Sequence, residues 1–209
     1  VCATRCREVT GGNNAVEIVL RSIPYDIPTL AKQKVPQAIV RDGFPKDGIV
    51  LVTGPTGSGK STLLAGMIKH LLITTDSRVL TYEAPPEFPL VAIPDIKGMI
   101  SQCEIGTHIE SFAAGVRNAL RRKPDYILIG EARDRETIEM CIRAGETGHG
   151  VYTTLHTRGV LNAIDRMADE FPPDVRWGVK VKLIDAMRLI IHQRLVKTPD
   201  GKRTALREW

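Results

Sequence analysis

Residues 54–62 are the part of this sequence whose residue types and spacing point most directly to chemistry. They read GPTGSGKST and fit the pattern G-x-x-x-x-G-K-[ST] at every fixed position. A polyphosphate binds several backbone N–H groups at once, and glycines let a loop wrap around it without side-chain clashes. In such a loop Lys60 supplies a positive charge to the β and γ phosphates, and the Ser61 hydroxyl is a ligand of Mg²⁺. The run therefore predicts a nucleoside triphosphate site formed by Gly54, Pro55, Thr56, Gly57, Ser58, Gly59, Lys60, Ser61 and Thr62.

Two carboxylates follow hydrophobic runs further along the chain. Glu131 comes directly after the run 126–130, and Glu83 ends the run 79–82, with Glu87 four residues beyond it. Hydrolysis of ATP needs a carboxylate that helps to hold Mg²⁺ and a base that orients the attacking water. Both belong at the carboxyl ends of neighbouring parallel strands. Glu131 therefore fits the second phosphate-site motif, Walker B, with Glu in place of the commoner Asp. Glu83, taken alone, is equally compatible with a surface carboxylate.

Two histidines, His149 and His156, bracket one short hydrophobic run in TGHGVYTTLHT at 147–157. A histidine at the carboxyl end of a strand can donate a hydrogen bond to a γ-phosphate and so distinguish ATP from ADP. From spacing alone, the alternative is equally good: two histidines satisfied by backbone carbonyls. A zinc site is not expected, because further ligands at suitable spacing are missing.

The elements that must position these residues alternate in type. The short β-branched run 49–52 precedes the glycine-rich loop, and apolar residues recur at helical spacing after it. Alternation of strands and helices implies a parallel sheet covered on both faces. We predict strands at 49–53, 78–83, 126–130 and 150–155 and helices at 60–73, 110–122 and 134–145. The proline-rich segment 84–107 has no clear periodicity and is longer than a passive connection needs.

The two ends of the chain carry hairpin patterns. Residues 1–23 resemble two antiparallel strands around a Gly-Gly-Asn-Asn turn, and residues 24–36, with three prolines, are expected to be an extended linker at a domain boundary. Near the other end, the runs 189–196 and 203–207 flank Pro-Asp-Gly, which predicts a second hairpin. Because the sequence begins with Val1 rather than Met, we expect further residues upstream.

The composition is that of an ordinary globular protein, with 43% hydrophobic and 25% charged residues. No apolar run approaches the roughly 18 residues of a membrane span, so any membrane contact is expected to be peripheral. The net charge of +5 permits a nucleic-acid partner but does not require one, and the densest basic run, 121–123, closes a predicted helix, where cations are favourable. The cysteines show no C-x-x-C pair, which favours free thiols at Cys2, Cys6, Cys103 and Cys141.

Four motifs together resemble one protein family. GPTGSGKST at 54–62, TYEAPPEF at 81–88, ILIGEARD at 127–134 and TGHGVYTTLHT at 147–157 are similar, in order and spacing, to the motifs of the secretion ATPase superfamily. Its members are PilT- and VirB11-like hexameric motors of type IV pili and of type II and type IV secretion. The segment 111–138 looks most like the ATPases of type IVB secretion and conjugation, the DotB and TraJ group.

This resemblance implies an α/β fold with a RecA-like P-loop NTPase core and a mostly parallel sheet. That core would span residues 37–209, with C-terminal helices and a hairpin, and follow the last hairpin of a mixed α/β amino-terminal domain. The implied activity is Mg²⁺-dependent hydrolysis of ATP to ADP and phosphate by a homo-hexamer. The implied location is the cytoplasm, at the inner-membrane face of a secretion complex.

Carried over position by position, the resemblance also assigns roles to single residues. Glu83 becomes the general base, and Glu131, with Ser61, lies on the Mg²⁺ side. His156 becomes the γ-phosphate sensor, supported by His149. Arg21 matches an arginine that, in the family, reaches a neighbouring subunit's nucleotide, although a surface ion pair explains a strand arginine equally well.

This sequence departs from the family pattern at two places. Family members often have Glu-Asp-Pro where residues 83–85 read Glu-Ala-Pro, which leaves the choice of base open between Glu83 and Glu87. Many carry Arg where Cys103 stands, so an interface contact through that arginine is not expected here.

Three other functions fit parts of the pattern. A pilus retraction ATPase would have the same site residues, and a nucleic-acid translocase could use the same RecA-like core with the basic run 121–123. A nucleotide-gated binding module without turnover would need neither Glu83 nor Glu131, so the presence of both favours an enzyme.

Overall fold

The structure, a computed structural model, describes residues 2–6, 15–19 and 24–209. In the first two segments, β1 (Cys2–Cys6) and β2 (Ala15–Val19) pair antiparallel, with Cys2 opposite Val19. The alternating pattern predicted this pairing. The Gly-Gly-Asn-Asn turn and Arg21 lie outside the described residues.

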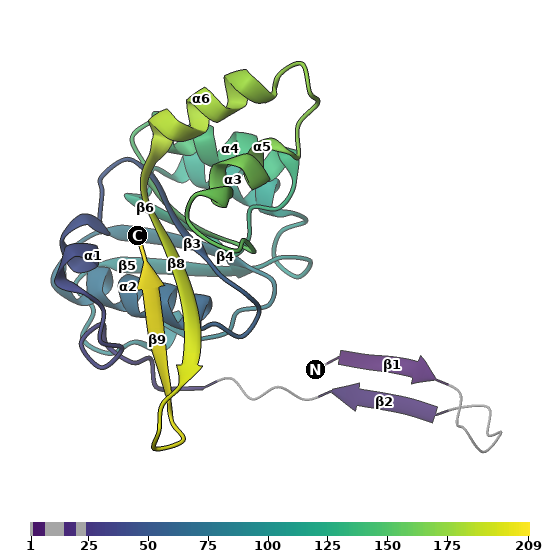
Figure 1. Cartoon of the computed structure of the whole chain (residues 1–209). Helices are drawn as coiled ribbons and strands as arrows, with labels where there is room; N and C mark the ends of the chain where they lie inside the picture. The colour runs from purple at the N-terminus through teal and green to yellow at the C-terminus, as the bar shows by residue number, and fades with distance from the viewer. Residues whose placement is uncertain (1, 7–14, 20–23) are drawn as a thin grey trace.

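A seven-stranded sheet forms the centre of residues 24–209 (Figure 1). Its strand order is β5-β4-β6-β7-β3-β8-β9, and every neighbouring pair is parallel except β8 with β9. The predicted mostly parallel sheet is therefore confirmed, as is the hairpin near the end of the chain. The strands are β3 (Gly48–Thr53), β4 (Arg78–Glu83), β5 (Met99–Glu104), β6 (Tyr126–Ile129), β7 (Gly150–Leu155), β8 (Met187–Lys197) and β9 (Arg203–Glu208).

Helices cover both faces of this sheet, with α1 and α2 on one face and α3 to α6 on the other (Figure 1). Successive residues of a buried parallel strand point to opposite faces. On β3, Val50 and Val52 accordingly join the core under α2, whereas Ile49 and Leu51 join the core under α3 to α6. The helices are α1 (Gln37–Asp42), α2 (Lys60–Thr74), α3 (Phe112–Arg122), α4 (Arg135–Glu146), α5 (Asn162–Ala168) and α6 (Arg176–Ala186).

Local capping explains where α3 and α4 begin. Ser111 accepts a hydrogen bond from the backbone N–H of Ala114, and Asp134 accepts one from that of Thr137. Each side chain satisfies a first-turn N–H that has no partner within the helix. The predicted helices at 110–122 and 134–145 agree with the observed ones within the usual uncertainty of helix ends.

The segment 24–36, predicted as an extended linker, packs in part on the face of the sheet that α2 covers. Ile27, Leu30 and Val35 are buried in its core. Gln33 Nε2 donates to Pro28 O at 2.9 Å and to Thr62 O, in the first turn of α2, at 3.0 Å. The segment is therefore packed and hydrogen-bonded against the start of α2, and the domain boundary within it stays a prediction.

The segment 84–107, which showed no periodicity, contains a short 3-10 helix, η1 (Leu90–Ala92), and the whole of β5. The sequence did not predict β5. It is an edge strand reading MISQCE, and its residues are exposed or partly exposed. Such a strand lacks the continuous apolar run of the central strands.

Within the described ranges, no helix is long and apolar enough to span a membrane. Cys103 and Cys141 are free thiols, as predicted, and burial raises the pKa of Cys141 to about 12. The side chains of Cys2 and Cys6 are not described.

Candidate functional site: a phosphate-binding cavity

The loop 54–62 joins β3 to α2 and turns through three glycines with positive φ. The angles are 142° at Gly54, 75° at Gly57 and 83° at Gly59, which residues with side chains rarely adopt. A Cβ on Gly54 would also lie 2.2 Å from the carbonyl oxygen of Gln193, so that position requires glycine. The N-cap Gly59 has no side chain to accept the first N–H groups of α2. These groups are therefore available to an anion, as the phosphate-site prediction requires.

Lys60 lies inside the loop, with only 8% of its surface exposed. Its Nζ donates to Gly54 O at 2.9 Å and to Pro55 O at 3.1 Å, and it lies 3.4 Å from His156 Nδ1. Burial lowers the pKa of Lys60, and the negative charges of Glu131 and Glu87 oppose that shift. The ammonium is thus directed by loop carbonyls toward the space where a polyphosphate would bind.

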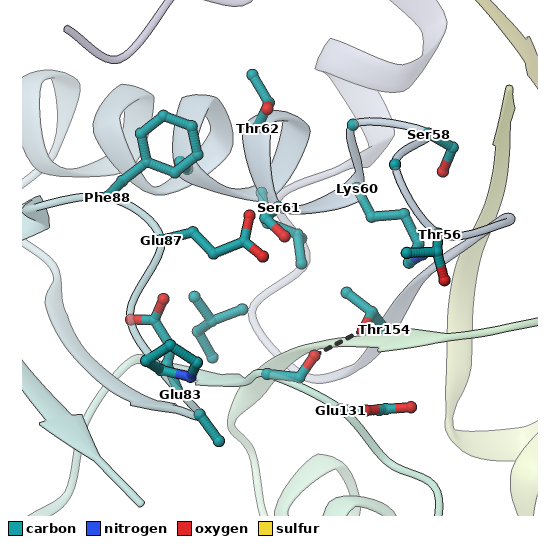
Figure 2. Close-up of a pocket in the computed structure, with 18 of the residues that line it drawn as sticks. Thr56, Ser58, Lys60, Ser61, Thr62, Glu83, Glu87, Phe88, Glu131 and Thr154 are labelled. Atoms are coloured by element: carbon teal, nitrogen blue, oxygen red, sulfur yellow. Dashed lines mark hydrogen bonds between the residues drawn. The ribbon is translucent and has the colours of Figure 1, made fainter. Parts of the chain in front are cut away.

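A cavity of about 450 Å³ opens beside the loop, at the carboxyl ends of the parallel strands (Figure 2). This volume lies within the range of small-molecule sites. The cavity is lined by the loop residues 56–62, by Glu83 and Glu87 from the end of β4 and the segment after it, and by Glu131 after β6. Thr154 and His156 line it from β7 and the residues that follow. The sheet topology therefore brings together residues that are far apart in the sequence, as predicted from their positions at strand ends.

Glu83 is held by donors from two strands. Its Oε1 accepts from Thr81 Oγ1 at 2.8 Å on its own strand and from Gln102 Nε2 at 2.7 Å on β5. Burial raises the pKa of Glu83, while these two hydrogen bonds and one from the backbone of Glu87 oppose the increase. Glu83 is therefore partly buried and accepts two side-chain hydrogen bonds, an environment that differs from that of an ordinary exposed carboxylate.

Glu131, which follows β6, lies between two cationic or protonatable side chains. Its Oε1 is 3.8 Å from His156 Nε2, and its Oε2 is 3.7 Å from Arg133 Nη1. Both distances are longer than those of hydrogen bonds, and the contact with Arg133 is a loose ion pair. Thr154 Oγ1 donates to Gly130 O at 2.6 Å and so joins β7 to the residue that precedes Glu131 (Figure 2).

The residues in the cavity fit ATP with Mg²⁺. Ser58 Oγ is buried without a hydrogen-bond partner among the described residues, and an unsatisfied buried hydroxyl is costly unless a ligand supplies an acceptor. The Ser61 hydroxyl and the Glu131 carboxylate line the same cavity. Oxygen ligands of this kind, completed by water and phosphate oxygens, are those that Mg²⁺ prefers.

His149 does not lie in this cavity, which corrects the prediction that it supports His156. It precedes Gly150 at the start of β7, and His156 follows Leu155 at the end of the same strand. Six strand residues separate them by roughly 20 Å. His149 Nδ1 instead lies 3.2 Å from Ala144 O, so the alternative of a histidine satisfied by a backbone carbonyl is correct for this residue.

Sequence reasoning missed three residues of the site. Arg133 lines the cavity, but it is one of several charged residues that follow β6, and nothing in the sequence distinguishes it from the others. Gln102 lies on β5, which was not predicted, and Gln193 Nε2 donates to Ser58 O from β8 at 2.7 Å. A glutamine in a strand carries no motif that would have identified either amide.

Two residues that the family pattern singled out remain. Cys103, where this sequence departs from the pattern, is half-buried on β5, and Arg21 is outside the described residues.

Comparisons with known proteins agree with this geometry. The family model described as "Type II/IV secretion system protein" matches residues 18–208. The solved structure of the ATPase DotB from Legionella pneumophila is 47% identical, with a TM-score of 0.92, and the match covers 98% of this chain and 56% of that one. A solved structure of the pilus retraction motor PilT with bound ADP is 40% identical, with a TM-score of 0.84, covering 90% of this chain and 54% of that one.

Among curated relatives, the type IV pilus retraction ATPase PilT of Pseudomonas aeruginosa is 39% identical over 196 residues. This match covers 94% of the chain and 56% of the relative. The chain therefore spans a little over half the length of the relatives it matches here.

Proposed function

The chain belongs to the family of type II/IV secretion system proteins, and from this premise we propose that it is the ATPase subunit of a hexameric motor that powers type IVB secretion or conjugative transfer. Its fold is the α/β core of RecA-like P-loop ATPases. Two solved DotB structures have higher TM-scores against this chain, 0.92 and 0.89, than the PilT structure, 0.84, which supports the type IVB assignment. Their sequence identities, 47% and 35%, lie on either side of the 40% found for PilT.

One observation carries the proposed chemistry: a single cavity contains Lys60, Glu83 and Glu131 at the carboxyl ends of parallel strands. Binding alone needs a cationic loop, whereas hydrolysis needs a carboxylate on the metal and a second one near the attacking water. The reaction is ATP plus water to ADP plus phosphate. The bound ADP of the PilT structure supports the same ligand class.

Each residue has one task in this reaction. Lys60 exchanges its hydrogen bonds to Gly54 O and Pro55 O for β- and γ-phosphate oxygens. Glu83 orients water and accepts its proton, and His156, 3.4 Å from Lys60 Nζ, donates to the γ-phosphate. Ser61 and Glu131 would hold Mg²⁺, which supplies positive charge against the phosphate oxygens when it is bound.

The rest of the proposal concerns the assembly. We assign the chain to a homo-hexamer in the cytoplasm, bound peripherally to an inner-membrane secretion complex. Arg21 of one subunit would reach the nucleotide of its neighbour. The hexamer and this location derive from the family, and nucleic acid is not a required partner.

Two substitutions test the enzymatic assignment. Lys60→Ala and Glu131→Ala should each reduce phosphate release by at least a hundredfold, because an electrostatic contact to the transferred phosphoryl group or its metal is lost. Circular dichroism should be unchanged. The exposed residues Lys97 and Glu146 offer matched controls, Lys97→Ala and Glu146→Ala, which should retain activity. Normal phosphate release from Lys60→Ala or Glu131→Ala would contradict the assignment.

A second candidate, a type IV pilus retraction ATPase, is favoured by the match to PilT over 94% of the chain. The site residues and the reaction would be the same, and only the neighbouring machinery would differ. Genes encoding pilus components beside this gene would favour retraction, whereas genes of a secretion or transfer complex would favour the first assignment.

A further inference from the structure

Gln102 connects three parts of the molecule beside the cavity: β5, β4 and the segment 84–94. In the register of the parallel pair, Gln102 lies opposite Thr81. Thr81 and Glu83 are two residues apart on β4 and so project from the same face of the sheet. The Gln102 side chain therefore reaches Glu83, and its Nε2 donates to Glu83 Oε1 at 2.7 Å.

The contacts of the Gln102 amide fix its orientation. Nε2 also donates to Phe88 O at 2.9 Å, and Oε1 accepts from the Leu90 N–H at 3.1 Å, a donor shared with Phe88 O. A flipped amide would place Oε1 against a carboxylate and a carbonyl oxygen, and Nε2 against an N–H group. All three contacts would then be repulsive, so only one orientation satisfies the partners.

The segment that contacts Gln102 is itself anchored. Phe88 is 7% exposed and Leu90 is 1% exposed, and both belong to the core under α2. The amide therefore joins Glu83 to a packed part of the protein rather than to a loose loop. Together with Thr81 Oγ1, it places two donors from different strands on one oxygen, Glu83 Oε1.

We propose that Gln102 is a positioning residue for the general base: it holds the Glu83 carboxylate in one orientation and ties that orientation to the segment 84–94. The inference rests on the proposed function, in which Glu83 accepts the proton of the attacking water. Gln102 touches no substrate in this scheme. It acts through Glu83, and it would restrict the carboxylate to the orientation that water requires.

The same hydrogen bond has an electrostatic consequence. Donation by Gln102 favours the ionised carboxylate and lowers the pKa of Glu83 against the increase that burial causes. Its removal should therefore raise that pKa further. The charged and titratable groups that face Glu83 are Glu87 on the same segment, Glu104 opposite it on β5, and Lys60, Glu131, Arg133 and His156 across the cavity. Substitution of Gln102 leaves all of them in place.

The test measures phosphate release by the full-length protein as a function of pH, roughly from 5 to 9, with Gln102→Leu and Gln102→Glu. For Gln102→Leu we expect kcat to fall about tenfold to a hundredfold, with KM changed much less, because positioning and not binding is lost. The acidic limb of the profile should move to higher pH. Gln102→Glu should move it further, since a second carboxylate disfavours ionisation of Glu83.

A readout without turnover accompanies the kinetics. Amide hydrogen exchange over residues 86–92 should be faster in nucleotide-free Gln102→Leu, because the Leu90 N–H loses one of its two acceptors. Gln33→Leu is the matched control, since the Gln33 amide also donates to two backbone carbonyls. It should destabilise the fold comparably without moving the acidic limb or the exchange over residues 86–92.

The outcomes separate the two proposals. If the wild type releases no phosphate, the proposed function is overturned. If the wild type is active but Gln102→Leu keeps the wild-type acidic limb, the positioning role is overturned while the function stands. Gln33→Leu could also lower kcat as much as Gln102→Leu does, while the acidic limb of both variants stays at the wild-type pH. That result would likewise show that Gln102 has only a structural role.

Discussion

Glu83 combines two opposing requirements at the scale of one residue. Burial makes its charged form unfavourable and raises its pKa, yet a general base must be deprotonated to act. Hydrogen bonds from Thr81 and Gln102 lower the pKa of Glu83 in part, but they do not cancel the increase that burial causes. We therefore expect the acidic limb of the pH–rate profile to lie above the ordinary pKa of glutamate, with activity lost as pH falls through the raised value.

Glu83→Gln should separate activity from stability. The side-chain oxygen can still accept from Thr81 and Gln102, but the amide cannot take a proton, so kcat should fall at least a hundredfold. A carboxyl group whose pKa is raised by folding destabilises the native state once pH exceeds its unfolded value. The variant should therefore have a higher Tm than the wild type at about pH 8, and this difference should shrink at about pH 4.

Glu87→Gln is the companion variant, because the sequence left the base open between Glu83 and Glu87. If Glu83 is the base, Glu87→Gln should retain more activity than Glu83→Gln. The reverse order, measured by phosphate release at saturating ATP, would move the role to Glu87.

The stability prediction for Glu83→Gln has its own contrary outcome. A Tm of Glu83→Gln that is lower than that of the wild type at both pH values would contradict the electrostatic argument.

At this scale, sequence reasoning located the site residues that follow strands, but not the residues whose hydrogen bonds position them. The phosphate loop, Glu83, Glu131 and His156 could be predicted because a motif or a strand end fixed their place, although their roles stay predictions. His149 was misplaced because a whole strand separates it from His156. Gln102 could not be found, since its function depends on a register between strands that no local pattern encodes.

At the scale of elements, a polar network joins the phosphate loop to the segment 24–36. Gln193 on β8 donates to Ser58 O, and Arg207 on β9 donates from Nε to Gln193 Oε1 at 2.8 Å. The other guanidinium nitrogens of Arg207 donate to Lys34 O at 3.1 Å and Gln33 O at 3.2 Å. Movement of the loop on nucleotide binding can therefore reach this segment through two side chains.

Arg207→Met should loosen that connection. Loss of the guanidinium leaves Gln193 Oε1 and two backbone carbonyls without this donor, which should destabilise the protein by roughly 1–3 kcal/mol in denaturant unfolding. Hydrogen exchange over residues 27–35 should become faster, and ADP should protect this segment less than in the wild type. Arg203→Met, an exposed position on the same strand, is the control and should change neither. Equal ADP protection in Arg207→Met and wild type would contradict the connection.

The elements themselves followed largely from the sequence. The central strands could be predicted because burial on both faces demands continuous apolar runs, and α2 because it follows the phosphate loop. The edge strand β5 could not, since pairing with β4 rather than its own composition makes it a strand. The prolines of the segment 24–36 predicted an extended linker, and they did not predict that Ile27, Leu30 and Val35 would be buried in the core.

At the scale of the whole molecule, the question is whether one chain completes the site. An arginine already lines the cavity in the described part of the chain: Arg133, 3.7 Å from Glu131. The resemblance to the family also leads us to expect a second arginine, Arg21, to reach this site from a neighbouring subunit. The two arginines can be distinguished because Arg133 would act on the same chain's site as Glu83, whereas Arg21 would act on the site of the neighbouring subunit.

Mixed rings provide the distinction. If Arg21 acts across the interface, Arg21→Ala subunits mixed with Glu83→Ala subunits should recover activity, because an Arg21→Ala subunit keeps its own base and can receive Arg21 from a Glu83→Ala neighbour. Random assembly in equal amounts makes such a complete site at about one interface in four. Arg133→Ala mixed with Glu83→Ala is the matched control: both residues serve the same chain's site, so no interface regains both and activity should stay at the level of the single variants. Recovery in the second mixture and none in the first would place Arg133, not Arg21, across the boundary between subunits.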